Sequence, residues 1–349
     1  TKQWSYGGNV QYRTTSFKIG LNAVQHHFSQ PIDKADEPYN LFAIEGRKWA
    51  NASLDYSYTY KNVYLFGEAA IDQNGSKAFL HGLLASLHTN ADIALLYRNI
   101  SARYQSLYGN AFTESTMPTN ERGFYIGVTI RPWTTLRLQA YADHYRFPWL
   151  RFRIDAPGSG NDYLLQATYL PNKRWEAYVR LRSENKTANN RPAGASTNEV
   201  TGNVRGSLRL HLSYKATAAL TLRTRAEGVV VKAPGSARER GFLLYGEALY
   251  KWTNRLSANG RLQYFETGSF NSRIYVYESD VFYAYSIPSF SGRGWRYYAN
   301  VSYDVSEKVT AWLRWSHTRY GGQNGVGTGL EQSSGPHRSE VKLQVRWIF

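Results

Sequence analysis

The feature that most constrains this chain is an alternation of apolar and polar residues with a period of two, clearest in residues 204–230. Strict alternation is typical of a β-strand whose two faces meet different surroundings. The apolar positions include Leu208, Leu210, Leu220 and Leu222, and the polar positions include Arg205, Arg209, Arg223 and Arg225. The pattern therefore predicts strands and raises the question of which face points inward.

The same alternation recurs along the whole sequence in paired runs. Short turns such as 60–62, 214–217 and 305–308 join the runs of a pair, and longer polar connections such as 104–121 and 267–292 separate the pairs. Short turns at one end and long loops at the other are typical of outer-membrane barrels, whereas a soluble β-sandwich has shorter strands and no such asymmetry. We therefore predict an all-β fold: a transmembrane antiparallel outer-membrane β-barrel over residues 1–349, with about 17–18 strands, short periplasmic turns and long extracellular loops.

The number of runs gives a further expectation. The predicted strands are 3–12, 16–28, 47–60, 62–72, 78–88, 92–103, 122–131, 135–147, 161–170, 174–185, 203–214, 217–230, 240–251, 254–266, 293–304, 308–319 and 337–349. If the short turns are periplasmic, the first and last runs point the same way, while bacterial barrels normally have an even strand count. We therefore expect one more strand upstream of Thr1 and a longer parent protein.

Composition agrees with a membrane β-structure. The chain has 28 Tyr, 10 Trp and one Met, and no apolar run approaches the roughly 20 residues of a membrane-spanning helix, which excludes an α-helical membrane protein. A mean hydropathy of −0.52 is compatible with a barrel, because a barrel strand needs an apolar residue only at every second position. Cysteine is absent, which excludes disulfides and thiolate metal sites.

The orientation of the faces follows from the barrel. An arginine facing lipid at mid-membrane costs about 2–4 kcal/mol, so we expect leucines toward lipid and arginines toward the lumen. The candidate lumen-lining basic residues are Arg98, Arg180, Arg182, Arg205, Arg209, Arg223, Arg225, Arg261 and Arg314. With a net charge of +16, this set is suited to bind or conduct anions, or else to pair across strands with acids such as Glu227 and Glu247.

Two segments near long connections are candidates for special roles. The stretch 145–157 places aromatic residues beside cations at a predicted extracellular strand end, which suits stacking on sugars or bases, or else a self-packed loop beyond an aromatic girdle. Its candidate residues are Arg146, Trp149, Arg151 and Arg153. The stretch 274–288 alternates inside a long connection, so we expect it to fold inward as a plug or a hairpin.

Several stretches also resemble a known family: LDYSYTYKNVYLFGEAA (54–70), IALLYRNISARYQSLYGNAFTE (93–114), YADHYRFPWLRFRIDAP (141–157), SRIYVYESDVFYAYSIP (272–288) and SEVKLQVRWIF (339–349). Together they resemble the C-terminal barrel region of the helix-hairpin-helix domain-containing outer-membrane proteins of Bacteroidota. The resemblance implies a bacterial outer-membrane location and a helix-hairpin-helix segment upstream. No Gly-apolar-Gly turn with helical flanks occurs in residues 1–349, so DNA binding is not transferred to any residue of this chain.

The C-terminal stretch resembles the last-strand signal that the barrel insertion machinery reads. Its residues are Leu343, Val345, Trp347 and Phe349, at alternate positions. The same positions are also those of an ordinary lipid-facing strand.

The residues point to transport rather than catalysis. The eight histidines show no paired metal-ligand spacing, and no catalytic triad, carboxylate pair or phosphate loop stands out, so we predict no enzyme activity, no cofactor and no metal. The leading hypothesis is a channel or transport component with a basic lumen for anionic or polar solutes. The alternative is a non-conducting membrane anchor or accessory subunit of a larger outer-membrane complex, linked to DNA uptake through the upstream helix-hairpin-helix segment. Expected partners are outer-membrane lipid, lipopolysaccharide, the insertion machinery and other outer-membrane subunits.

Overall fold

A computed structural model describes residues 2–191, 197–322, 325–327 and 332–349. By its internal contacts the chain divides into two compact units, which we describe separately. Unit 1 comprises residues 1–132, 138–165 and 184–204, and unit 2 comprises residues 133–137, 166–183 and 205–349. Among the described residues, no helix is long and apolar enough to cross a membrane.

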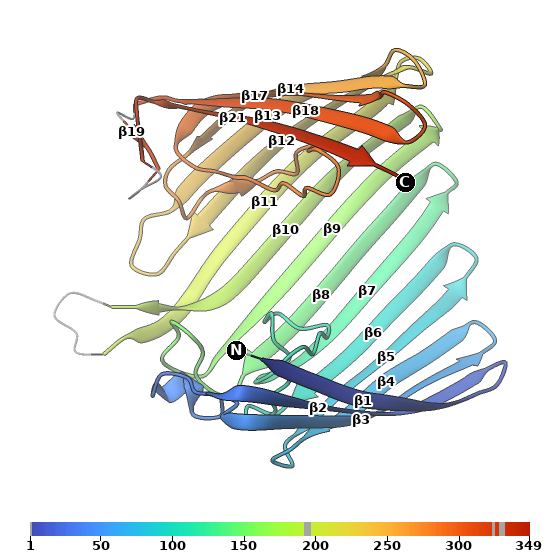
Figure 1. Ribbon diagram of the computed structural model, residues 1–349, viewed down its shortest axis with the longest axis vertical. Helices are drawn as coiled ribbons and strands as arrows, with labels where there is room; N and C mark the ends of the chain where they lie inside the picture. Colours follow the sequence, from blue (N-terminus) through green and yellow to red (C-terminus); the bar gives the residue numbers. More distant parts are fainter. Residues whose placement is uncertain (1, 192–196, 323–324, 328–331) are drawn as a thin grey trace. The chain divides into compact units, whose positions relative to one another are not determined.

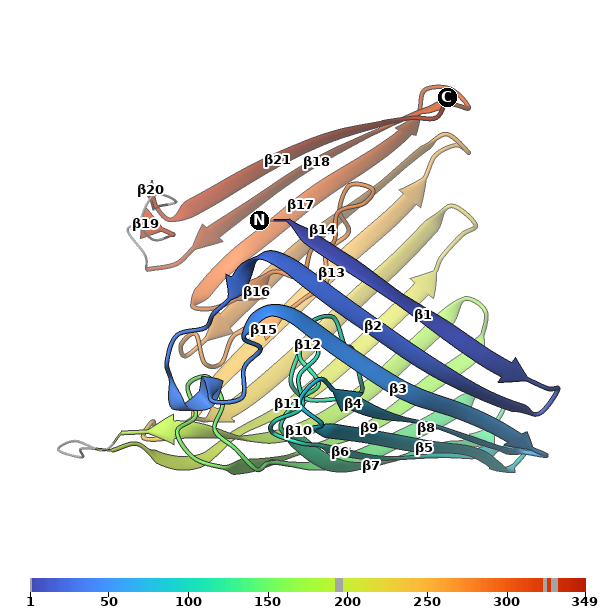
Figure 2. The ribbon, with the colours of Figure 1, turned by 60° about the horizontal axis from the view of Figure 1, so that its bottom comes forward.

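Unit 1 is built on strands that follow one another in the chain and pair with their sequence neighbours. From β1 to β7 each strand is antiparallel to the next, and β1, β2 and β3 lie side by side in both ribbon views (Figures 1 and 2). The elements are β1 (Gln3–Arg13), β2 (Phe17–Ile32), η1 (Pro38–Asn40), β3 (Gly46–Tyr60), β4 (Val63–Asp72), β5 (Lys77–His88), β6 (Ala91–Ile100), β7 (Glu121–Trp133), most of β8 (Leu136–Phe147) and the first half of β9 (Gly158–Asn172).

Unit 2 repeats this pattern. Its strands pair antiparallel in the order β12, β13, β14, β17, β18, β21, and two short hairpins interrupt the chain between long strands. The elements are most of β10 (Trp175–Asn190) and β11 (Glu199–Lys215), then β12 (Leu220–Lys232), β13 (Glu239–Lys251), β14 (Leu256–Thr267), β15 (Ile274–Tyr275), β16 (Ser289–Phe290), β17 (Arg293–Asp304), β18 (Val309–Tyr320), β19 (Gly325–Val326), β20 (Ser333–Ser334) and β21 (His337–Trp347).

The all-β prediction is confirmed, and among the described residues 17 long strands belong to the main sheet, as predicted. Most predicted bounds differ from the observed ones by one to three residues. The larger differences are in three strands: β2 continues to Ile32, β10 continues to Asn190 and β11 begins at Glu199. These extensions are mostly polar, and a backbone ladder can continue through polar residues once it has left the apolar band of the membrane.

Exposure answers the question that the alternation raised. Leu208 and Leu210 on the apolar face are 44% and 47% exposed, whereas Arg225 and Arg314 on the charged face are 7% and 1% exposed. A soluble sheet would bury its leucines and expose its arginines. This reversed arrangement fits a sheet whose apolar face meets lipid.

The face assignment predicts unequal effects of two neighbouring substitutions. Leu210→Arg places a charge in hydrocarbon and is expected to destabilise the folded barrel by about 2–4 kcal/mol. Arg209→Leu removes a partner of Glu227 but leaves Arg225 bonded to that carboxylate, so we expect a smaller loss. Folding yield into lipid vesicles, measured by heat-modifiable migration, should therefore be lower for Leu210→Arg. Equal yields would contradict the assignment.

Candidate functional site

The main candidate site is in unit 2, where residues 268–292 form a hairpin that packs on the charged face of the sheet. Its strands β15 and β16 pair Ile274 with Phe290 and Tyr275 with Ser289, and a bridge joins Glu278 to Ser286. The expectation of an inward-folding hairpin in this stretch agrees with these contacts. We call residues 268–292 the inserted hairpin.

Apolar side chains anchor one end of the inserted hairpin. Ile274 and Phe290 are 0% and 3% exposed and belong to one buried cluster with the sheet residues Val229, Leu243 and Phe265. Burying a side chain of this size contributes roughly 1.5–3 kcal/mol, so this end of the hairpin is firmly docked. The sheet leaves space for it at Gly241, where an added Cβ would come within 2.8 Å of the Ser272 carbonyl oxygen.

Arginines from three strands hold the backbone of the inserted hairpin. Each donates a hydrogen bond to a carbonyl oxygen, and the accepting carbonyls are at every second residue, which is the spacing of an extended segment crossing the strands. The bonds are Arg205 Nη2 to Arg273 O (2.6 Å), Arg225 Nη2 to Tyr275 O (3.2 Å) and Arg261 Nη1 to Tyr277 O (2.8 Å). On β17, Asn300 Nδ2 donates to Asp280 O at 3.1 Å, three residues beyond Tyr277.

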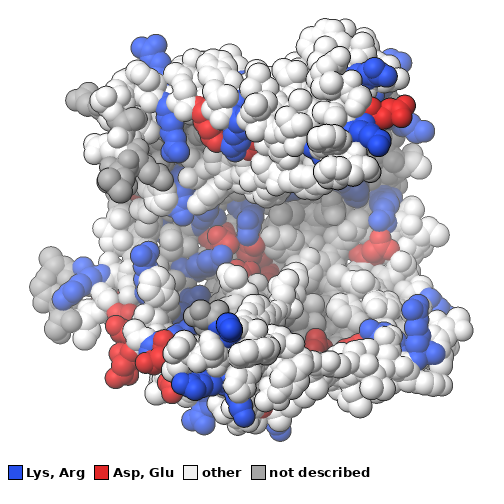
Figure 3. Space-filling model, viewed as in Figure 1, with Lys and Arg blue, Asp and Glu red and all other residues white. Residues whose placement is uncertain are grey.

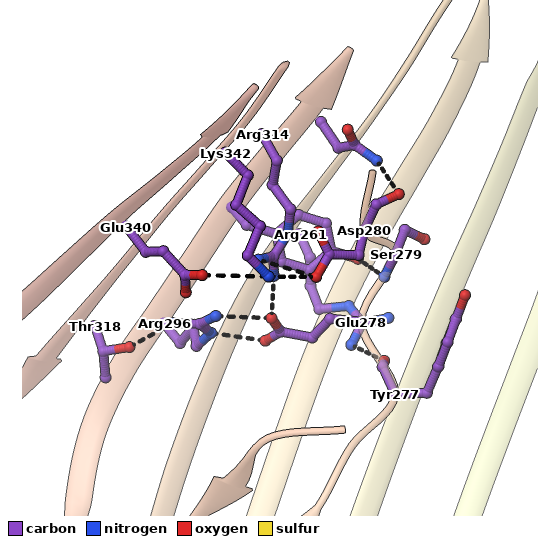
Figure 4. Close-up of polar contacts among 12 residues, drawn as sticks. Arg261, Tyr277, Glu278, Ser279, Asp280, Arg296, Arg314, Thr318, Glu340 and Lys342 are labelled. Atoms are coloured by element: carbon purple, nitrogen blue, oxygen red, sulfur yellow. Dashed lines mark hydrogen bonds and ion pairs between the residues drawn. The ribbon is translucent and has the colours of Figure 1, made fainter. Parts of the chain in front are cut away.

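Ion pairs hold the two acids of the inserted hairpin (Figure 4). Arg296 Nε lies 2.7 Å from Glu278 Oε1, and Arg314 Nη2 lies 2.5 Å from Glu278 Oε2. Lys342 Nζ lies 2.8 Å from Asp280 Oδ2. The Glu278 side chain is fully buried, and burying a charged carboxylate is unfavourable unless it is paired. The charge-assisted bonds from the two arginines compensate this loss of hydration. The cations come from β17, β18 and β21.

The remaining arginines of the predicted set in unit 2 lie on the same charged face. Arg209 Nε is 2.8 Å from Glu227, which also accepts a bond from Arg225, and Arg261 Nη2 is 3.2 Å from Glu247. Arg223 reaches Glu247 only at 3.8 Å, while Arg180 Nε donates to Gln166 at 2.6 Å and Arg182 is exposed on β10. In Figure 3 most of the visible face is white, and the few groups of red acidic side chains adjoin blue basic ones. These contacts match the cross-strand pairing that the sequence suggested.

Unit 1 contains a second segment, residues 101–120, that packs on the charged face of its own strands. Its anchor is Arg98, whose Nε lies 2.6 Å from Glu121 Oε1 and whose Nη1 lies 2.9 Å from Asp143 Oδ1. The side chains of Arg98 and Glu121 are fully buried. Glu121 also accepts bonds from the backbone N–H groups of Glu114 and Ser115, so the ion pair connects the segment to β6, β7 and β8.

A cavity of about 390 Å³ lies between this segment and strands β2 to β6 of unit 1. Its polar lining consists of Asn22, His26, Asn51, Ser53, Glu68, Tyr104, Ser106, Tyr108 and Asn110. Burial raises the pKa of the Tyr104 phenol, which is therefore a neutral hydroxyl at physiological pH. The rest of the lining is apolar and includes Val24, Leu80 and Ile100, so the cavity combines apolar walls with a few polar groups, as small-molecule sites do.

The candidate extracellular segment around residue 150 packs on its own unit. The Arg151 guanidinium lies 3.5 Å from the centroid of the Phe147 ring, and Trp149 Nε1 donates to the Pro38 carbonyl at 3.1 Å. Arg153 has a positive φ of 64° and lies over Phe152, while Arg146 is exposed on the opposite face of β8. These contacts favour the self-packed loop.

The last strand has the geometry expected of a lipid-facing strand. Leu343, Val345 and Trp347 are 72%, 60% and 65% exposed, and the Trp347 ring stacks on Phe349 at 5.4 Å. Recognition by the insertion machinery stays a prediction.

Sequence reasoning missed the acids and cations that fix the two packed segments. These residues are Glu121, Asp143, Glu278, Asp280, Arg296 and Lys342. Their charges could be read from the sequence, but their partners lie on strands far away along the chain. In the described part of the chain, no group of three or more His, Asp or Glu side chains is placed to hold a metal ion.

Comparison with known proteins identifies the class of fold. No protein-family model and no curated protein matches the chain. The copper transporter OprC is similar in structure, with 11% identity, a TM-score of 0.54 and coverage of 91% of this chain and 60% of that chain. A mutant of the ferric enterobactin receptor of Pseudomonas aeruginosa has 12% identity and a TM-score of 0.53, with coverage of 99% and 62%. OmpT, an outer-membrane protein of Vibrio cholerae, has 9% identity and a TM-score of 0.44, with coverage of 97% and 99%.

These likenesses show the fold of an outer-membrane β-barrel, and the exposed apolar face of the strands fits such a fold. The chain spans about 60% of the length of the copper transporter and of the enterobactin receptor.

Proposed function

We propose that this chain is an outer-membrane channel or transport component for anionic or polar solutes, in which the inserted hairpin lines the solute path. The observation that carries the proposal is the uneven distribution of charge. Unit 1 contains 17 Lys and Arg against 15 Asp and Glu, whereas unit 2 contains 25 against 11. The cations of this excess that lie on the charged face, such as Arg223 and Arg261, would raise the local anion concentration along an aqueous path.

The proposal predicts a modest anion preference that depends in part on exposed cations of the charged face. The Arg223 side chain is 39% exposed and its nearest acid, Glu247, is 3.8 Å away, while Arg182 is exposed on β10. Replacing both with Gln is expected to lower the anion-to-cation permeability ratio while leaving the fold intact. The measurement is the reversal potential of the reconstituted protein in a salt gradient.

A matched control removes two cations from a short turn. Lys173→Gln with Arg174→Gln changes the net charge equally but lies between β9 and β10, away from the hairpin, so the permeability ratio should stay near that of the wild type. An unchanged ratio in the Arg182 and Arg223 variant, or the same decrease in the control, would contradict the proposal.

One observation favours a second function. The inserted hairpin is fixed by contacts to β11, β12, β14, β17, β18 and β21, as expected of a plug in a non-conducting anchor or accessory subunit. Such a subunit, with or without an upstream DNA-binding segment, should give no current at any salt concentration and should co-purify with partner proteins. A steady current from the purified chain alone would exclude it.

A further inference from the structure

Four strands begin with the same three-residue pattern of a cation, a small residue and an aromatic residue. The four instances are Lys77-Ala78-Phe79 in β5, Arg122-Gly123-Phe124 in β7, Arg240-Gly241-Phe242 in β13 and Arg293-Gly294-Trp295 in β17. Two of them extend to an identical Glu-Arg-Gly-Phe, at 121–124 and 239–242. All four follow connections at the end of the strands that also carries the long loops.

The middle residue of each pattern lies on the charged face and has to be small. Ala78 is buried against Ile100 and Tyr104. An added Cβ at Gly123 would lie 2.5 Å from the Arg98 guanidinium carbon, and one at Gly294 would lie 2.5 Å from the Arg319 carbonyl oxygen. The packed charged face therefore explains the middle position but not the two residues beside it.

The cation and the aromatic residue lie on the opposite, apolar face. The strand register pairs Phe124 with Tyr97 and Phe242 with Glu266, so the members of each pair lie on the same face. The side chains of Phe124, Phe242 and Trp295 are 45%, 43% and 49% exposed. Aromatic residues on a lipid-facing surface mark the membrane interface. Each cation precedes its aromatic residue by two positions, so both lie on the same face and the cation is about 7 Å nearer the end of the strand that carries the long loops. This is the level expected for the lipid head groups.

The cations are available for an external partner. In the described part of the chain, no carboxylate lies within ion-pairing distance of Lys77, Arg122 or Arg240. Arg293 lies 3.9 Å from Glu266, and its side chain remains 67% exposed. We call Lys77, Arg122, Arg240 and Arg293 the rim cations.

We propose that the rim cations bind the phosphate groups of the outer-leaflet glycolipid, lipopolysaccharide, whose acyl chains pack on the adjacent aromatic residues. The outward-facing side chain, the aromatic residue beneath it and the position at the long-loop end all fit a phosphate attached to a lipid. A soluble anion would not need the aromatic neighbour. Arginine is suited to the task because its planar guanidinium binds phosphate through two hydrogen bonds.

The test compares two variants of the full chain with the same change of charge. The rim variant carries Lys77→Gln, Arg122→Gln, Arg240→Gln and Arg293→Gln. The control variant carries Lys173→Gln, Arg174→Gln, Arg255→Gln and Lys308→Gln, all exposed residues in short turns at the other end of the strands. Heat-modifiable migration checks that both variants fold.

Binding of lipopolysaccharide in detergent is measured by native mass spectrometry, with dephosphorylated lipopolysaccharide and inorganic phosphate as competitors. We expect the rim variant to lose affinity by about tenfold or more, since each cation near an anionic lipid surface contributes about fivefold. The control variant and the wild type should bind equally, and dephosphorylated lipopolysaccharide should compete weakly.

Three outcomes would overturn the proposal. The first is unchanged affinity in the rim variant, and the second is an equal loss in both variants, which would indicate only general charge attraction. The third is full competition by inorganic phosphate at concentrations equal to those of the lipid, which would indicate a site for a free anion.

Discussion

Single-channel conductance is expected to rise, and anion preference to increase, when the two acids of the inserted hairpin are neutralised by Glu278→Gln with Asp280→Asn. Both side chains are at most 1% exposed, and Arg296, Arg314 and Lys342 are their partners. Breaking a buried ion pair from one side costs about 3–5 kcal/mol, because the remaining charges stay buried without compensation. The expected result is a hairpin that leaves the charged face at this end and exposes three cations.

The control for this experiment neutralises two acids that do not touch the hairpin. Asp36→Asn with Glu307→Gln changes the net charge equally, and both residues are exposed in connections between strands. Conductance and permeability ratio should match those of the wild type. If the hairpin variant and the wild type conduct identically, the hairpin does not line the solute path. If neither conducts, the channel proposal fails and the anchor proposal gains support.

A large loss of stability is expected from Arg98→Met. The substitution leaves Glu121 and Asp143 buried side by side without their cation, and a loss of about 3–5 kcal/mol in the free energy of unfolding follows. Urea unfolding in lipid vesicles, followed by tryptophan fluorescence, measures this loss. Arg223→Met is the matched control, since its side chain is 39% exposed and its acid lies 3.8 Å away, and we expect a change within about 1 kcal/mol.

A rescue variant separates the charge effect from packing. Adding Glu121→Gln and Asp143→Asn to Arg98→Met removes the uncompensated charges, so part of the lost stability should return. Equal losses for Arg98→Met and Arg223→Met would show that the buried ion pair does not stabilise unit 1.

Charge is sorted between the two faces of the strands in a way that serves both proposals. Acids such as Glu121, Glu227 and Glu247 lie on the charged face, where they pair with arginines, while the rim cations lie on the apolar face at one end of the strands. Under the two proposals the positive net charge has two separate uses. One part fixes inserted segments and would bias the solute path, and the other part would face the lipid head groups.

The class of fold, the number of long strands and the direction of each face could be predicted from the amino-acid sequence. A period of two is a local property, because successive side chains of a strand point to opposite sides, and the cost of an arginine in hydrocarbon then decides which side meets lipid. The bounds of β3, β13 and β17 could be predicted to within one residue for this reason.

The contacts made by the charged face could not be predicted in this way, because they depend on how distant parts of the chain pack together. Arg261 could be placed on that face from the sequence, but its bonds to Glu247 and to the Tyr277 carbonyl depend on how the inserted hairpin crosses the strands. Glu278 and Arg314 are 36 residues apart, and no local pattern relates them. Ion pairs of this kind join strands to a loop that meets them only after folding. Their physical cause is therefore the packing of the inserted hairpin on the strands, and not the two-residue alternation of apolar and polar side chains.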